Sequence, residues 1–142
     1  MKQIRLHADY ESARAIGPWL EEALTELGSL QLDRVGELEL AIHEVAINIV
    51  DHAFNGAEGH DYTITLRAAE CGTGVVATFH DSGDPFVSAP TPSPTEPQVG
   101  GYGLFIAEQL ASSVNYERLD HANRWTLIFT SSPDQPTAQD PS

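Results

Sequence analysis

A helix with two stripes of side chains constrains this chain more than any other feature. Residues 37–54 read ELELAIHEVAINIVDHAF, and apolar side chains recur there at helical spacing. These apolar residues are Leu38, Ala41, Ile42, Val45 and Ile49. Glu44, Asn48 and His52 follow an i, i+4, i+8 spacing and form a polar stripe beside them. Asparagine is a poor helix former, so Asn48 needs another reason for its place, although boundary polar residues are common beside buried faces.

The segments before this helix predict a strand and a second helix. Lys2–His7 alternates polar and apolar side chains, as a strand does. Residues 10–27 predict an amphipathic helix, which Gly28 would end. Pro18 either kinks this helix or marks its true start. Asp33 is the predicted N-cap of the helix that carries Glu44 and Asn48.

The segments after it predict two hairpins joined through a helix. Residues 62–67 and 75–80 predict the first antiparallel pair of strands, and residues 114–117 and 125–129 predict the second. Residues 103–112 return to a helical pattern. The order of elements predicts an α+β fold, a two-layer sandwich whose mixed, mostly antiparallel sheet is covered on one face by helices.

Two segments lack a helix or strand pattern. Residues 81–101 hold five prolines, and a loop of this length in a compact domain is a lid, a binding loop or disordered. The tail from Ser131 is rich in Pro, Asp, Gln and Ser, which is typical of disorder. We therefore expect one domain over residues 1–130 and a disordered tail over residues 131–142.

Composition disfavours several classes of function. Seven basic residues against 21 acidic ones give a formal charge of −14, which argues against a nucleic-acid ligand and suits a basic protein partner. We find no secretory leader and no apolar run long enough for a bilayer, so we expect no membrane partner. The single cysteine, Cys71, cannot form an intramolecular disulfide and suits a reducing compartment. These features predict a cytoplasmic protein.

Two further motifs add chemistry to the polar stripe. DSGDPF, at residues 81–86, follows a strand, and Asp before Gly is ordinary turn chemistry. A buried Asp81 can instead accept the exocyclic amine of adenine, with Gly83 allowing the base to approach the backbone. GGYGLFIAEQL, at residues 100–110, places three glycines before a helix, where free amides can surround an anion. A packing or hinge role for these glycines is the alternative, because the spacing is neither a P-loop nor a Rossmann fingerprint.

In this order the three motifs resemble the N, G1 and G2 boxes of the GHKL ATPases. The matching residues are Glu44-x-x-x-Asn48 with Asp51-His52-Ala53, Asp81-x-Gly83-x-x-Phe86, and Gly100-Gly101-x-Gly103-Leu104. Within that superfamily the chain looks most like the anti-sigma-factor serine/threonine kinases of bacterial partner-switching systems. Residues 105–106, 115–117 and 123–127 are also similar to those kinases, and the resemblance covers about residues 1–130.

The resemblance implies a Bergerat-type fold, in agreement with the predicted sandwich, and a site for ATP and Mg²⁺. Asn48 would hold Mg²⁺ through its carboxamide oxygen, a suitable hard ligand. Glu44 would be the general base, acting on a water or on the serine hydroxyl of a partner protein. Asp81 would read adenine. His52 would have an orienting or structural role.

The same resemblance assigns the remaining nucleotide contacts. Gly83 would support the base, and residues 87–99 would form a lid over the nucleotide. The other implied nucleotide-binding residues are Phe86 and Leu104, together with Gly100, Gly101 and Gly103 around the phosphates. The sequence has no Lys or Arg between Arg67 and Arg118. Nucleotide affinity should therefore depend strongly on Mg²⁺, unless Arg5, Arg14 or a partner reaches the phosphates.

The leading hypothesis is an ATP-dependent serine/threonine protein kinase that also acts as an anti-sigma-type regulator. It would phosphorylate a small anti-sigma-factor antagonist and bind a sigma factor or another target, and the resemblance implies a homodimer. The alternative is a nucleotide-gated protein-binding module without phosphotransfer, which would not need Glu44 beside Asn48. A third interpretation, a plain α+β interaction domain, requires all three motifs to be structural.

Overall fold

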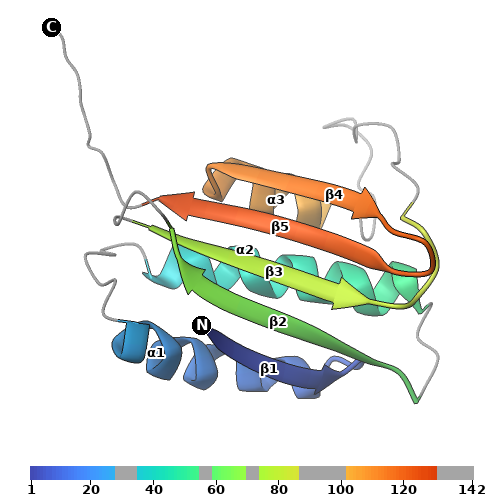
Figure 1. Ribbon diagram of the computed structural model, residues 1–142, viewed down its shortest axis with the longest axis horizontal. Coiled ribbons are helices and arrows are strands. Elements are labelled where there is room, and N and C mark those ends of the chain that lie inside the picture. The colour runs from blue at the N-terminus through green and yellow to red at the C-terminus, as the bar shows by residue number, and fades with distance from the viewer. Residues whose placement is uncertain (28–34, 55–58, 70–73, 87–101, 131–142) are drawn as a thin grey trace, which may run out of the picture.

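A five-stranded antiparallel sheet forms one layer of the molecule (Figure 1). The computed structural model describes residues 1–27, 35–54, 59–69, 74–86 and 102–130. The strands are β1 (Lys2–His7), β2 (Asp61–Ala68), β3 (Gly74–Asp81), β4 (Ser113–Arg118) and β5 (Asn123–Thr130). They lie in the order β1-β2-β3-β5-β4, and every neighbouring pair is antiparallel. The predicted fold class is confirmed, and the described sheet contains no parallel pair.

Three α-helices cover one face of this sheet (Figure 1). They are α1 (Ile16–Leu27), α2 (Val35–Asn48) and α3 (Tyr102–Leu110). A 3₁₀ helix, η1 (Ser12–Ala15), precedes α1, and a π-helix, η2 (Ile49–Ala53), follows α2. None of the described helices has the length and apolar composition that a membrane span requires.

The core lies between the helices and the covered face of the sheet. The core side chains of β2 are Tyr62, Ile64 and Leu66, and those of β3 are Val75, Ala77 and Phe79. The predicted apolar stripe packs against them and is fully buried: Leu38, Ala41, Ile42 and Val45 of α2, and Ile49 of η2. Trp125, Leu127 and Phe129 of β5 also share this face, as their alternation predicts.

Two predicted helices differ in detail from the observed ones. The single helix over residues 10–27 is wrong: η1 comes first, and α1 begins only at Ile16. Pro18 lies in the first turn of α1, where a missing N–H costs no helical hydrogen bond, so it marks the start of the helix and does not kink it. The helix over residues 37–54 is α-helical only to Asn48 and continues as η2. Gly28 and Asp33 lie outside the described residues.

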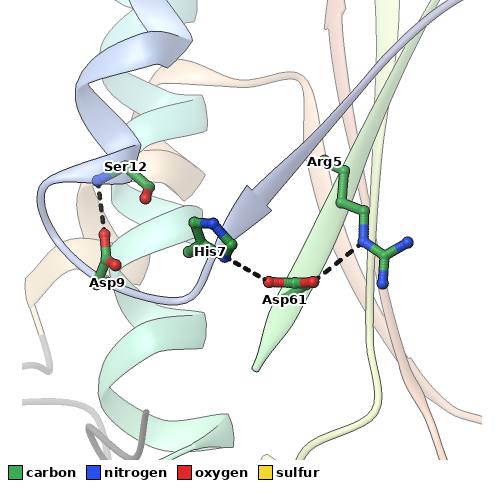
Figure 2. A network of polar contacts seen from close by, with 5 residues as sticks. All are labelled: Arg5, His7, Asp9, Ser12 and Asp61. Carbon is green, nitrogen blue, oxygen red and sulfur yellow. Dashed lines mark hydrogen bonds and ion pairs between the residues drawn. The ribbon is translucent and has the colours of Figure 1, made fainter. Parts of the chain in front are cut away.

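No described helix covers the opposite face of the sheet (Figure 1). At its β1–β2 edge Arg5 Nε donates to Asp61 Oδ2 (3.2 Å), and His7 Nδ1 lies 2.8 Å from Asp61 Oδ1 (Figure 2). Arg5 therefore binds Asp61 on the face opposite to α2. The suggestion that Arg5 reaches the phosphates stays a prediction.

Candidate functional site

The polar stripe of α2 ends in a buried amide. Asn48 is the last residue of α2 and only 6% exposed, and its Oδ1 has no hydrogen-bond partner among the described residues. Glu44 lies one turn earlier and is half-buried, whereas His52 is exposed in η2. Buried oxygens nearly always have a partner, so an unpaired one indicates a place for a ligand. A neutral amide oxygen suits a hard cation.

A single π-turn follows Asn48 immediately. Helices with i→i+5 hydrogen bonds are rare and frequently lie at functional sites. η2 carries Asp51 and His52, which belong to the same sequence motif as Asn48. The Asp51 carboxylate accepts a hydrogen bond from the hydroxyl of Tyr10, which ties this turn to the segment after β1.

The turn after β3 packs directly on the end of η2. Asp84 N–H donates to Ala53 O (2.8 Å), and a Cβ built on Gly83 would lie only 2.4 Å from that same oxygen. The rings of His52 and Phe86 meet edge to face with centroids 6.2 Å apart. The first two motifs are therefore neighbours in space. Gly83 permits this contact within the chain, and its predicted role toward a base stays a prediction.

Asp81 is held by one of its carboxylate oxygens. Its Oδ1 accepts from Gly83 N–H (2.8 Å) and from Asn123 Nδ2 (2.8 Å), while its Oδ2 has no partner among the described residues. The side chain is only 5% exposed. Burial raises the pKa of Asp81 above its ordinary value, against the opposing effect of these hydrogen bonds and of the nearby Arg118 and His80. The free oxygen is suited to accept a hydrogen bond from a ligand.

The structure describes only part of the third motif. Gly103 lies at the start of α3, and α3 packs against α2. Leu104 is half-buried against the core. Gly100 and Gly101 lie outside the described residues, as do the segment 87–99 and Cys71, so their predicted roles stay predictions.

Sequence reasoning gave no role to three residues that surround Asp81. Asn123 lies directly opposite Asp81 in the pairing of β3 with β5. The Oδ1 of Asn123 accepts hydrogen bonds from Tyr116 OH and from Arg118 Nη1. Arg118 Nη1 also donates to Gly83 O (2.8 Å), so a cation does reach this turn. The only sequence signal was the similarity of residues 115–117 and 123–127 to the kinases named above.

Comparisons with known proteins agree on the fold. The chain matches the family model described as histidine kinase-like ATPase domain over residues 6–129. It is 32% identical over 123 residues to the serine/threonine-protein kinase BtrW of Bordetella bronchiseptica, a match that covers 82% of this chain and 84% of BtrW.

A solved structure of the RsbU and RsbW domains of Rv1364c from Mycobacterium tuberculosis shares the fold, with a TM-score of 0.56 and 21% identity. That match covers 92% of this chain but 32% of the other, so the present chain spans about a third of that longer protein.

Proposed function

Because this chain belongs to the histidine kinase-like ATPase family, we propose that it binds ATP with Mg²⁺ and phosphorylates a serine or threonine of a partner protein. One observation carries the proposal. Two buried oxygens without a partner among the described residues, Asn48 Oδ1 and Asp81 Oδ2, belong to motifs that pack on each other through Ala53 and Gly83. The likeness to a serine/threonine kinase over most of the chain supports the reaction class.

The two unpaired oxygens fit the groups that this reaction needs. Asn48 Oδ1 would be the protein ligand of Mg²⁺, which commonly keeps phosphate and water oxygens as its other ligands. Asp81 Oδ2 would accept the 6-amino group of adenine. The backbone amides of Gly100, Gly101 and Gly103 would surround the phosphates. ATP would supply the phosphoryl group, and Mg²⁺ would neutralise charge on the phosphate oxygens.

Glu44 would act as the general base. Its half-buried carboxylate lies one turn before Asn48, on the same side of α2. Glu44 would accept the proton of the serine hydroxyl while the hydroxyl oxygen bonds to the γ-phosphorus and the bond to the β–γ bridging oxygen breaks. The products are then a phosphoserine and ADP.

We further propose a place in a partner-switching system. The substrate would be a small protein of the anti-sigma-factor-antagonist type, and the bound target a sigma factor or a comparable regulator. The formal charge of −14 favours a basic target over a direct nucleic-acid ligand. The relatives BtrW and the RsbW domain support this assignment through their names alone.

Calorimetric titration with a β,γ-imido analogue of ATP, with and without Mg²⁺, tests the site. We expect binding that strengthens with Mg²⁺ in the wild type and the loss of that Mg²⁺ effect in Asn48→Ala, because the variant lacks the amide oxygen. Titration with an unrelated divalent-metal chelate serves as a control for charge effects. Unchanged Mg²⁺-dependent affinity in Asn48→Ala would remove this residue from the metal site.

A nucleotide-gated binding module without phosphotransfer is the second candidate. The absence of Lys and Arg between Arg67 and Arg118 favours it, because kinases commonly use a cation on the phosphates. Glu44→Ala separates the two functions in an assay of phosphate transfer to antagonist-type proteins of the same organism. We expect nucleotide binding to persist and transfer to fall at least about a hundredfold, the usual contribution of a general base. Equal rates of phosphate transfer in the wild type and in Glu44→Ala would exclude Glu44 as the base.

A further inference from the structure

Asn123 joins three strands at the rim of the candidate site. It is the first residue of β5 and lies directly opposite Asp81 of β3 on one side and Arg118 of β4 on the other. Its side chain is only 1% exposed. A single buried amide is therefore in contact with the carboxylate of one neighbouring strand and the guanidinium of the other.

The orientation of this amide is fixed by its partners. Its Nδ2 donates to Asp81 Oδ1 (2.8 Å) and to Asp84 O (2.8 Å). Its Oδ1 accepts from Tyr116 OH and from Arg118 Nη1 (3.1 Å). Turning the amide over would set its NH₂ group against the Arg118 guanidinium, which only donates, and its oxygen against the two oxygens Asp81 Oδ1 and Asp84 O. Only the observed orientation satisfies all four contacts.

This orientation, together with Gly83 N–H, fixes where the second oxygen of Asp81 lies. Asn123 Nδ2 and Gly83 N–H both bind Oδ1, so the carboxylate cannot rotate without losing two hydrogen bonds at once. Oδ2 is left buried and without a partner among the described residues. A carboxylate oxygen accepts hydrogen bonds only, so it attracts the 6-amino group of a purine and repels a 6-oxo group.

We propose that Asn123 is a positioning residue that fixes Asp81 so that Oδ2 alone meets the base, and thereby makes the site select a 6-amino purine. This inference rests on the proposed function, in which Asp81 faces the base. Asn123 acts here through Asp81 and does not itself need to contact the nucleotide.

Tyr116 secures Asn123 from β4. Its hydroxyl donates to Asn123 Oδ1 and accepts from Phe86 N–H (2.9 Å). Its ring packs on Trp125 and on Phe86, with centroid separations of 4.8 and 5.6 Å. Tyr116→Phe therefore removes the hydroxyl and keeps the aromatic packing, so it weakens the hold on Asn123 without opening the core.

The experiment compares two nucleotides that differ at one group. The β,γ-imido analogues of ATP and of purine riboside triphosphate, which lacks the 6-amino group, are titrated with Mg²⁺ into each protein. We expect the wild type to prefer the ATP analogue by about ten- to a hundredfold, the value of one hydrogen bond to a charged acceptor. The preference should fall close to one in Asn123→Ala and to an intermediate value in Tyr116→Phe. Asn115→Ala, an exposed asparagine of β4, is the matched control and should keep the preference.

The ratio separates positioning from a general structural role. Equal weakening of both analogues in Asn123→Ala, with the ratio retained, would overturn the positioning role. If Asn123→Ala fails to fold in a thermal melt, the ratio in Tyr116→Phe decides by the same rule. A wild type that binds both analogues equally would overturn this inference and leave ATP binding intact. A wild type that binds neither would overturn the proposed function itself.

Discussion

Asp81 and Asp61 end up on opposite faces of the same sheet, although they belong to neighbouring strands. Asp81 pairs with Tyr62 across β3 and β2, so these two share the covered face, and Asp61 beside Tyr62 points the other way. Burial raises the pKa of Asp81. The pKa of Asp61 is lowered, chiefly by its hydrogen bond with His7 and further by Arg5 (Figure 2). Two aspartate side chains thus have pKa values shifted in opposite directions.

The difference lies in how their oxygens are used. Both oxygens of Asp61 have partners, one in His7 and one in Arg5, and the group is in contact with solvent. Asp81 is buried and keeps one oxygen unpaired among the described residues. A carboxylate that is costly to ionise and has a free acceptor is typical of a functional site, whereas a paired and solvated one is typical of an edge contact between strands. The covered face is therefore where we expect a ligand.

Asp81→Asn should give the largest effect. The new amide can keep its oxygen toward Gly83 N–H and Asn123 Nδ2. Its NH₂ group then takes the place of Oδ2 and faces the 6-amino group of adenine, so that two hydrogen-bond donors oppose each other. We expect the affinity for the imido analogue of ATP to fall about ten- to a hundredfold by calorimetric titration. Asp61→Asn, on the open face, is the matched control and should bind like the wild type. Equal affinities in the two variants would remove Asp81 from the base site.

Gly83→Ala should give an effect of intermediate size on stability. The added methyl would lie 2.4 Å from Ala53 O, which belongs to the backbone and cannot move aside as a side chain can. We expect the free energy of unfolding to fall by about 1–3 kcal/mol in urea titrations, the usual cost of overpacking. Gly36→Ala is the control, because a Cβ there meets nothing within 4 Å. A loss of stability in Gly36→Ala as large as in Gly83→Ala would contradict the steric explanation.

The pH dependence of stability should give the smallest effect and should have opposite signs for the two aspartates. The folded pKa of Asp81 lies above its unfolded value, so the unfolded chain loses this proton first and the wild type loses stability relative to Asp81→Asn as the pH rises through that window. The folded pKa of Asp61 lies below its ordinary value. Its stabilisation is present above that value and is lost as the pH falls through the folded pKa.

Urea titrations of both variants between about pH 3 and pH 7 measure these differences. The free energy of unfolding of the wild type minus that of Asp81→Asn should fall as the pH rises. The free energy of unfolding of the wild type minus that of Asp61→Asn should instead increase as the pH rises. The same sign for both pairs would contradict the assignment of the two residues to opposite faces.

The sequence alone determined the local elements and the family. The sequence located all five strands to within about two residues. Period-two alternation did so for β1, β2 and β5, because these strands bury every second side chain. The spacing of Leu38, Ile42, Val45 and Ile49 identified the buried side of the central helix for the equivalent helical reason. Three motifs in a fixed order identified the family, which the family model over residues 6–129 confirms.

Tertiary structure alone decided which side chains surround Asp81 and which do not. Asn123 lies 42 positions from Asp81 in the chain, and only the pairing of β3 with β5 sets them opposite each other. Strand order is a long-range property, because many pairings satisfy the same alternation of buried and exposed residues. Strand pairing also sets Arg5 beside Asp61 on the open face and brings Arg118 to the Gly83 turn. Neither contact can be inferred from separation in sequence.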